Sequence, residues 1–109
     1  MDIKPTVYIY ESGASNAALQ EIAAGLEEEG IPWEIIACNT SDAKALAHAA
    51  ADHSRLRVGI GITVKAAALQ VRNLPENKPV FLIDIDDNLA SLRKLGINAA
   101  RAVKGGVFV

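Results

Sequence analysis

LRVGIGI, at residues 56–62, is the stretch of this sequence that decides its fold class. It is apolar almost throughout, whereas a strand with one solvated face would alternate apolar and polar residues. The stretch therefore predicts a strand that is buried on both faces, in a sheet covered by helices on either side. Such a strand belongs to an α/β domain.

Two glycines interrupt this apolar run. Gly59 and Gly61 lie inside the expected strand rather than in a turn that opens a helix, and the third glycine of a dinucleotide-binding fingerprint is missing. We interpret both glycines as points where another backbone packs closely on the strand.

Strands and helices alternate on both sides of this stretch. β-branched and aromatic residues predict the strands, and apolar residues at helical spacing predict the helices. Residues 66–71 are ambiguous between a helical turn and a short strand. The order predicts a three-layer α/β domain whose first three strands are parallel. The expected strands are Thr6–Tyr10, Trp33–Ala37, Leu56–Ile62 and Val80–Ile83, and the expected helices are Ala17–Glu29, Ala43 to about Ala51, and a last helix that carries Leu89, Leu92 and Val103.

Short polar residues before each helix predict where it begins, because their side chains accept hydrogen bonds from the first free N–H groups. Two adjacent residues are candidate caps for the first helix, and two adjacent residues are candidate caps for the second. The last helix is preceded by three candidate caps, and the negative charge of the acidic ones also matches the helix dipole. These candidates are Ser15 or Asn16, Ser41 or Asp42, and Asp86, Asp87 and Asn88.

Glycines mark two other points on the helices. Gly30 is expected to end the first helix, and Pro32 prevents the helix from resuming. Gly96 either interrupts the last helix or lets it pack closely on a neighbour. The residues before Gly30 are the acids Glu27–Glu29. They stand at the carbonyl end of the helix, where each acid is disfavoured by roughly 0.3–1 kcal/mol.

Length, composition and charge limit the class of protein. The 109 residues fit one domain, 1–109, and half of them are apolar while 5% are aromatic, so small and aliphatic side chains should form the core. The net charge is -2, and lysine and arginine are scattered, which argues against nucleic-acid binding. We find no signal peptide and no apolar run near the ~20 residues that span a bilayer. We therefore expect a cytoplasmic protein without a nucleic-acid or membrane partner.

An acidic cluster follows the strand at 80–83, at the edge where open α/β sheets place their sites. Asp84, Asp86 and Asp87 resemble the acidic pocket of a phosphoacceptor domain. Helix capping explains the last two better, and no lysine follows a later strand to complete such a site. A free-standing phosphoacceptor domain is thus a weaker alternative.

The other reactive side chains form no catalytic set. Cys38 is the single cysteine, and we interpret it as a small buried hydrophobe in or after a strand rather than a nucleophile. His48 and His53 are five residues apart, which puts them on different faces of a helix and favours surface roles over a metal pair. The sequence therefore favours a subunit over a free-standing enzyme.

Three segments together resemble the small (β) subunit of glycerol/diol dehydratase reactivating factors. They follow the order and rough spacing of that family, and the resemblance covers nearly the whole chain. The medium subunit of the adenosylcobalamin-dependent diol/glycerol dehydratases has similar segments but is longer at its N-terminus. This chain begins a few residues before its first strand, which favours the reactivating factor, with a short or divergent medium subunit as the alternative. The segments are GLEEEGIP at 25–32, LRVGIGI at 56–62 and LRKLGINAARAVK at 92–104.

The resemblance implies a fold and a role. The fold is an α/β three-layer sandwich with a mixed, mostly parallel sheet of four to five strands, one late strand antiparallel, in an anticodon-binding-domain-like topology. The role is that of an accessory subunit, not an enzyme, whose partner is a large ATPase subunit. By exchanging with dehydratase subunits it would release damaged cobalamin from the inactivated enzyme, while holding no cobalamin stably itself. A cytoplasmic location follows, with association with a bacterial microcompartment left open.

The resemblance also implies a metal site. In the family, a glutamate of the first segment ligates Mg²⁺ at the interface with the large subunit, and by position it corresponds to Glu28. Mg²⁺ prefers oxygen ligands and is often held by one or two carboxylates. Glu28 lies about 200° from Leu26 on a helical wheel, away from the apolar stripe. Glu29 stands where a neutral residue is expected in some relatives, so it is the alternative ligand.

Overall fold

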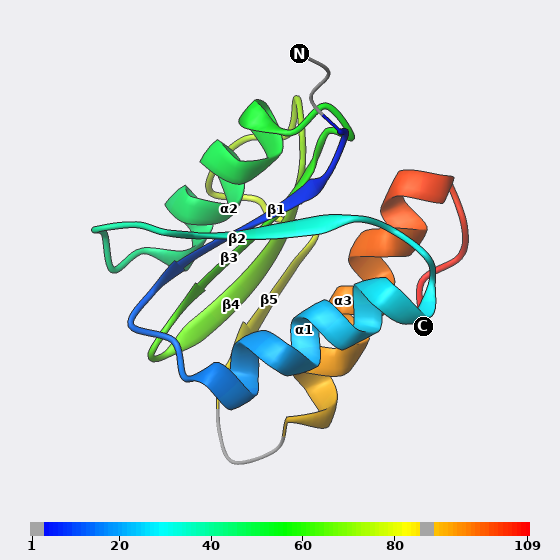
Figure 1. Cartoon of the computed structure of the whole chain (residues 1–109). Helices are drawn as coiled ribbons and strands as arrows, with labels where there is room; N and C mark the ends of the chain where they lie inside the picture. The colour runs from blue at the N-terminus through cyan, green and yellow to red at the C-terminus, as the bar shows by residue number, and fades with distance from the viewer. Residues whose placement is uncertain (1–3, 86–88) are drawn as a thin grey trace.

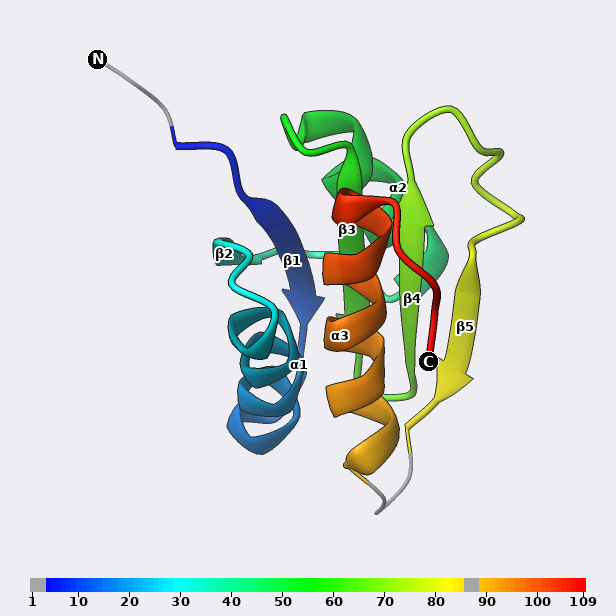
Figure 2. The same ribbon diagram turned by 90° about the vertical axis from the view of Figure 1, so that its right-hand side faces the viewer.

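The computed structural model describes residues 4–85 and 89–109. A five-stranded sheet lies in the middle, with α2 on one face and α1 and α3 on the other (Figures 1 and 2). This arrangement confirms the three-layer α/β prediction. The strands are β1 (Val7–Ser12), β2 (Trp33–Ala37), β3 (Val58–Thr63), β4 (Ala66–Val71) and β5 (Phe81–Asp84), and the helices are α1 (Asn16–Glu28), α2 (Ala43–His53) and α3 (Ala90–Lys104).

The strands follow the order β2-β1-β3-β4-β5 across the sheet. β1 runs parallel to both β2 and β3, as the sequence predicted. β4 runs antiparallel to both of its neighbours, β3 and β5. The sheet is therefore mixed, and β4 is the late antiparallel strand that the family resemblance implied.

The ambiguous residues 66–71 form strand β4 because they pair with β3 in a tight hairpin. Ala67 lies opposite Ile62, and Ala68 lies opposite Gly61. At the connection, the Thr63 hydroxyl oxygen accepts hydrogen bonds from the N–H groups of Lys65 and Ala66, both at 3.3 Å. The alanine-rich composition also suits a helix, but this pairing outweighs it.

Strand β3 is the centre of the molecule, and all six of its residues are buried, as predicted. It begins at Val58 rather than at Leu56, which corrects the expected boundary. Arg57 has a φ of 65°, a left-handed conformation that extended strands do not use, and its N–H donates to the Ser54 carbonyl at 3.0 Å. A turn therefore occupies the first part of the apolar stretch.

Strand β1 runs two residues further than expected. Glu11 and Ser12, which follow the expected strand Thr6–Tyr10, pair with Ile62 and Thr63 of β3. Their polar side chains gave no strand signal, because the pairing that fixes them involves the backbone. The end of β1 thereby reaches the same edge of the sheet as the end of β3.

Helix α2 lies directly on β3 because β3 has no side chains at the contact points. A Cβ atom at Gly59 would lie 2.3 Å from the Ala51 nitrogen, and one at Gly61 would lie 2.3 Å from both the Ala43 oxygen and the Ala47 nitrogen. These distances are far below van der Waals contact. They confirm that both glycines serve close backbone packing.

Helices α1 and α3 both lie on the opposite face of the sheet (Figures 1 and 2). Their backbones come into contact at another pair of glycines. A Cβ atom at Gly96 would lie 2.1 Å from the Ile22 oxygen, and one at Gly25 would lie 2.3 Å from the Arg93 oxygen. Helix α3 continues through Gly96 without a break. Of the two interpretations of Gly96, close packing is therefore correct.

The helix starts agree with the sequence where the structure describes them. The Ser15 hydroxyl accepts from the Ala18 N–H at 3.1 Å, and an Asp42 carboxylate oxygen accepts from the Lys44 N–H at 3.0 Å. The predicted caps at 86–88 lie outside the described residues. Leu89, which precedes α3, makes no side-chain cap hydrogen bond.

Candidate functional site: the acidic end of α1

Helix α1 ends in a closed backbone turn that presents its three glutamates. Gly30 has a φ of 73°, and its N–H donates to the Glu27 carbonyl at 3.0 Å. The Ile31 N–H donates to the Leu26 carbonyl at 3.1 Å. This pair of bonds is the Schellman ending, which satisfies carbonyls that would otherwise be free. The side chains of Glu27–Glu29 are therefore held on a rigid helix end.

Glu28 contacts a cation from α3. The Arg93 Nη1 donates to the Glu28 Oε1 at 2.8 Å, while the Arg93 Nη2 donates to the Glu21 Oε2 at 3.2 Å. The hydrogen bond with Glu21 is the largest cause that raises the pKa of the Arg93 guanidinium, and the bond with Glu28 acts in the same direction. The Glu28 side chain is nevertheless 49% exposed. It is oriented and still accessible from solvent.

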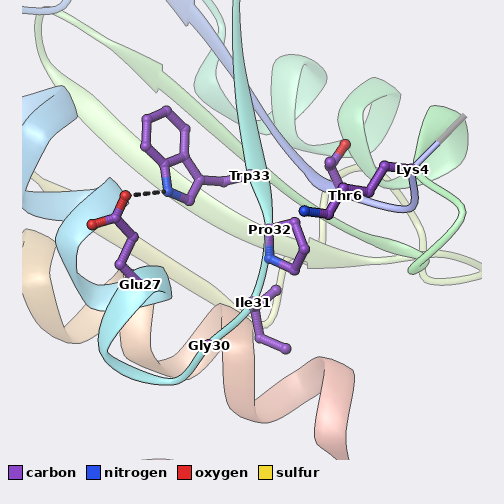
Figure 3. A pocket seen from close by; sticks show the side chains of 7 residues that line it. All are labelled: Lys4, Thr6, Glu27, Gly30, Ile31, Pro32 and Trp33. Atoms are coloured by element: carbon purple, nitrogen blue, oxygen red, sulfur yellow. Dashed lines mark hydrogen bonds between the residues drawn. The ribbon is translucent and has the colours of Figure 1, made fainter.

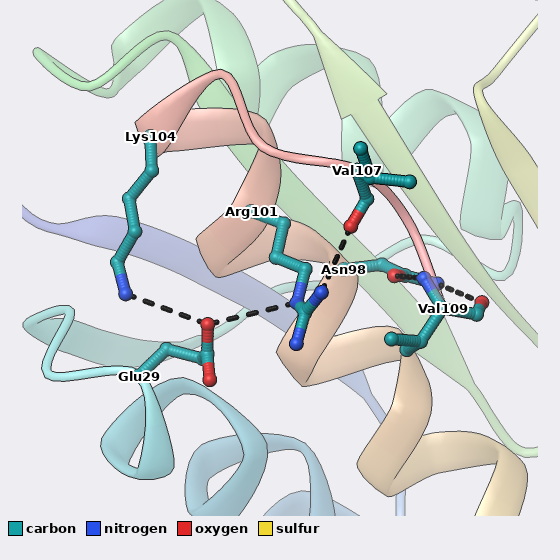
Figure 4. A network of polar contacts seen from close by, with 6 residues as sticks. All are labelled: Glu29, Asn98, Arg101, Lys104, Val107 and Val109. Atoms are coloured by element: carbon teal, nitrogen blue, oxygen red, sulfur yellow. Dashed lines mark hydrogen bonds and ion pairs between the residues drawn. The ribbon is translucent and has the colours of Figure 1, made fainter.

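Glu29 contacts two other cations of α3 (Figure 4). Its Oε1 lies 3.4 Å from the Lys104 Nζ and 3.6 Å from the Arg101 Nε. The Glu29 side chain is 24% exposed, about half the value for Glu28. Arg101 also donates from Nη1 to the Val107 carbonyl at 3.0 Å, so the same arginine holds the chain that follows α3. Glu29 is thus committed to contacts within the subunit.

Asn98 holds the far end of that following segment (Figure 4). Its side-chain oxygen accepts from the Val109 N–H at 2.8 Å, and its Nδ2 donates to the Val109 oxygen at 3.3 Å. Phe108 packs edge-on against Phe81 of β5, with ring centroids 5.2 Å apart. Residues 105–109 therefore lie against α3 and β5.

Glu27 points to the other side of α1, toward strand β2 (Figure 3). The indole N–H of Trp33 donates to the Glu27 Oε1 at 3.3 Å. This pair borders a shallow pocket of about 390 Å³ at the start of β2. The pocket is lined by Lys4, Thr6, Glu27, Gly30, Ile31, Pro32 and Trp33.

The unfavourable charge at the end of α1 is therefore offset by α3. Arg93, Arg101 and Lys104 fall within about 80° of one another on a helical wheel. That spacing is the signal by which the sequence could have revealed a basic face. Arg101 and Lys104 also stand in the last turn of α3, where cations are favoured by the helix dipole. Sequence reasoning did not match this face with the acids of α1.

Potential metal-ligating side chains are not clustered in the described part of the chain. This part contains no group of three or more histidine, cysteine, aspartate or glutamate side chains that could hold a metal ion. A single carboxylate on a helix end fits a shared ion, because Mg²⁺ keeps several waters and takes only one or two carboxylates from a protein. Glu28 is accessible for such a role.

A second depression lies at the carboxyl ends of β1 and β3, where open α/β sheets bind ligands. Its volume is about 400 Å³, and its polar side chains are hydroxyls and one lysine, which form no acid–base pair. The Thr63 hydroxyl is already engaged in the hairpin to β4. The depression is lined by Ser12, Gly13, Ser41, Thr63, Val64 and Lys65.

The remaining candidates are scattered. Asp84 ends β5 and is exposed, while Asp86 and Asp87 lie outside the described residues. The two histidines have separate partners: His48 lies 3.5 Å from an Asp52 carboxylate oxygen, and the His53 Nδ1 lies 2.6 Å from the Tyr10 hydroxyl. The described residues thus bring no catalytic set together.

Cys38 follows β2 and is half-buried rather than fully buried, which corrects part of its interpretation. Burial, followed by the nearby Glu11 carboxylate, raises the pKa of the Cys38 thiol. The thiol is therefore more protonated near neutral pH than a free cysteine, and the thiolate is the reactive form. This environment supports a structural role.

We expect iodoacetamide to alkylate Cys38 several-fold more slowly than free cysteine at pH 8. The raised pKa and the partial burial both lower the rate, and the rate should increase as the pH is raised. Mass spectrometry of the folded protein measures it, with the urea-unfolded protein as the control. A folded protein that reacts as fast as free cysteine would show that Cys38 is an activated thiol.

The family model described as the dehydratase medium subunit matches residues 4–109. The chain belongs to this family. The match includes the glutamates at the end of α1 and the arginine and lysine residues of α3 that contact them. No helix within residues 4–85 and 89–109 combines the length and the apolar character needed to cross a membrane.

Similar members of this family are small subunits of reactivating factors. The propanediol dehydratase-reactivating factor small subunit of Citrobacter freundii is 34% identical over 104 residues, which cover 95% of this chain and 90% of that protein. The probable glycerol dehydratase-reactivating factor small subunit of the same organism is 40% identical over 88 residues, with coverage of 79% and 75%. The chain therefore belongs with the small subunits of diol and glycerol dehydratase-reactivating factors, as the sequence predicted.

Solved structures of the family agree with this assignment. A chain in the structure of diol dehydratase-reactivating factor complexed with ADP and Mg²⁺ matches with a TM-score of 0.90 and 31% identity, covering 98% of this chain and 99% of that one. A glycerol dehydratase reactivase chain matches with a TM-score of 0.92 and 35% identity, with coverage of 97% on both sides. The mixed five-stranded fold is thus the fold of reactivating-factor chains.

Proposed function

We propose that this chain is the non-catalytic small subunit of an ATP-dependent reactivating factor and that it binds a large ATPase subunit. Its relatives are named small subunits, which implies a larger partner. The described residues form no catalytic set, so the ATPase activity would lie on the large subunit. The name of one structural neighbour, a reactivating factor complexed with ADP and Mg²⁺, supports a nucleotide-dependent partner.

The subunit would act by exchange with dehydratase subunits. Its family is that of the dehydratase medium subunit, so the two kinds of subunit would share a fold and compete for the same partner surface. Exchange would open an inactivated diol or glycerol dehydratase and let damaged cobalamin leave. The chain would hold no cobalamin stably, and it would act in the cytoplasm, with association with a bacterial microcompartment as an open alternative.

Glu28 would supply one carboxylate oxygen to a Mg²⁺ ion at the interface with the large subunit. The observation that carries this part of the proposal is the position of Glu28: it stands on a rigid helix end, oriented by Arg93, with its side chain 49% exposed. Bound there, Mg²⁺ would link the two subunits electrostatically. The large subunit would provide the other protein ligands, because the described residues of this chain include no group of three or more histidine, cysteine, aspartate or glutamate side chains that could hold a metal ion.

Glu28 suits this role better than the alternative, Glu29. The Glu29 carboxylate is more buried and lies near two cations, Arg101 and Lys104. To bind a metal it would have to leave both of them and the segment that Arg101 holds. Glu28 has to share or leave one arginine, which keeps Glu21 as a second partner.

We expect Glu28→Gln to weaken the Mg²⁺-dependent association with the large subunit by at least roughly tenfold, since even groups that only support a metal ligand contribute that much. The measurement is a titration of the immobilised large subunit of a diol dehydratase-reactivating factor, in Mg²⁺ and in EDTA. The residual affinity in EDTA should be the same for wild type and variant. A variant that binds as well as wild type in Mg²⁺ would show that Glu28 is not the ligand.

Two neighbouring variants serve as matched controls. Glu27→Gln makes the same change one residue earlier, on the side of α1 that faces Trp33, and should keep the Mg²⁺ dependence. Glu29→Gln tests the alternative ligand directly. If Glu29→Gln loses the Mg²⁺ dependence and Glu28→Gln keeps it, the ligand is shifted by one residue.

A dehydratase medium subunit is the second candidate function, favoured by the description of the matching family. Such a subunit would assemble with the catalytic dehydratase subunits and help to hold adenosylcobalamin. Purifying the tagged chain with either the large reactivating subunit or the catalytic dehydratase subunits separates the two functions. A stable, cobalamin-containing complex with the latter would favour the medium subunit.

A further inference from the structure

Arg93 lies between two carboxylates of α1 and binds both with one guanidinium group. Its Nη1 lies 2.8 Å from the Glu28 Oε1, and its Nη2 lies 3.2 Å from the Glu21 Oε2. Glu21 and Glu28 are two helical turns apart, which puts them on the same face of α1. The planar fork of an arginine can hold two such acceptors at once, whereas a lysine ammonium is a point charge.

The two carboxylates differ in accessibility. The Glu28 side chain is 49% exposed and the Glu21 side chain is 30% exposed. An ion approaching from solvent or from a partner therefore meets Glu28 first. Glu21 is the less exposed of the two acceptors that Arg93 binds.

We infer that Arg93 competes with the interface metal ion for Glu28, and that Glu21 retains Arg93 when the ion takes the carboxylate. This inference rests on the proposed function of Glu28. In the free subunit, the guanidinium neutralises Glu28 at the carbonyl end of α1, where an unpaired acid is disfavoured. In the complex, a divalent ion on the same carboxylate repels the guanidinium, whose bond to Glu21 avoids leaving an unpaired charge.

This arrangement makes the metal link between the subunits reversible. When the metal ion binds Glu28, the ion pair between Glu28 and Arg93 is broken or weakened, and when the ion leaves, the ion pair forms again. The metal ion therefore contributes less to the free energy of association than the metal–carboxylate attraction alone. Arg93 is thus a positioning residue that also limits the affinity. A subunit that works by exchange requires such a limit, because it has to leave its partner again.

The Mg²⁺ concentration at half-maximal association with the large subunit tests the inference. Arg93→Gln removes the competitor and should lower this concentration by about threefold, the size of an exposed ion pair. Glu21→Gln leaves Arg93 with Glu28 alone and should raise the concentration by a similar factor. The two substitutions act in opposite directions, whereas loss of a merely structural ion pair would weaken association in both variants.

Lys94→Gln is the matched control for net charge. It makes the same charge change as Arg93→Gln at the next residue of α3, whose side chain is exposed. If the Mg²⁺ concentration at half-maximal association is unchanged in Lys94→Gln, the effect of Arg93→Gln comes from the lost contact with Glu28 rather than from the change in net charge. Circular dichroism of each variant checks that the fold is kept.

The outcomes separate this inference from the function on which it rests. If wild-type association is indifferent to Mg²⁺, the metal site fails and the inference fails with it. If wild type depends on Mg²⁺ and Glu28→Gln does not, the metal site stands. In that case, two results would overturn the competition between Arg93 and the metal ion while leaving the metal site intact. One is a Mg²⁺ concentration at half-maximal association that is unchanged or higher in Arg93→Gln. The other is a concentration that falls as far in Lys94→Gln as in Arg93→Gln.

Discussion

Gly61→Ala should destabilise the protein by about 3 kcal/mol, at the upper end of the usual cost of overpacking a core. The new methyl group would lie 2.3 Å from the Ala43 oxygen and the Ala47 nitrogen and 2.7 Å from the Leu46 Cβ. Two of these three atoms belong to the α2 backbone, so no side-chain rotation relieves the clash. Helix α2 would have to move away from β3 as a unit.

Thermal and urea unfolding of the isolated subunit measure this effect. For a domain near 100 residues, a loss of ~3 kcal/mol corresponds to a fall in Tm of roughly 15 °C. Gly106→Ala is the control, because its methyl group would come no closer than 3.8 Å to another side chain. The control should stay within about 0.5 kcal/mol of wild type. A Gly61→Ala protein as stable as the control would mean that α2 does not lie on β3 as described.

Gly96→Ala should destabilise the protein by about 2 kcal/mol even though alanine favours helix. The substitution gains ~1 kcal/mol of helix propensity. Its methyl group would lie 2.1 Å from the Ile22 oxygen and 3.2 Å from the Gly25 Cα, and overpacking against backbone of this kind costs ~3 kcal/mol. Steric overlap therefore outweighs propensity, and α1 and α3 have to separate.

This substitution has a second consequence that unfolding alone does not show. Separating α1 from α3 lengthens the contacts of Glu28 with Arg93 and of Glu29 with Lys104, so the Mg²⁺ dependence of association should change along with stability. Urea unfolding measures the stability, and the Mg²⁺ titration with the large subunit measures the Mg²⁺ dependence of association. An increase in stability would show that the helices do not cross at Gly96.

Most of the layer structure was predictable because it follows from local patterns. The buried strand at 58–63 is visible as an apolar run, and the capping side chains of Ser15 and Asp42 act within three residues of their own position. Gly59 and Gly61 were recognised as packing glycines because they lie inside a strand rather than in a turn that opens a helix, and a glycine there allows another backbone to approach closely. These features depend on neighbours in the chain.

The assignments that were left open or were wrong occurred where pairing partners decide the structure. Residues 66–71 form a strand because β3 and β5 lie on either side of them, and Glu11 and Ser12 extend β1 because β3 continues alongside. Arg57 adopts a positive φ in a turn, whereas its apolar neighbours in the sequence predict a strand. None of these outcomes is encoded in the periodicity of the segment itself.

The acidic end of α1 shows the same division. The sequence by itself determined that three acids stand at the end of a helix, that Gly30 closes the helix, and that Glu28 points away from the apolar stripe. Only the tertiary structure decided which cations offset those acids, since Arg93 is 65 residues from Glu28 and Lys104 is 75 residues from Glu29. The physical reason is the crossing of α1 and α3 at Gly25 and Gly96: two backbones in direct contact bring together side chains whose attraction acts through space and leaves no periodic trace in the chain.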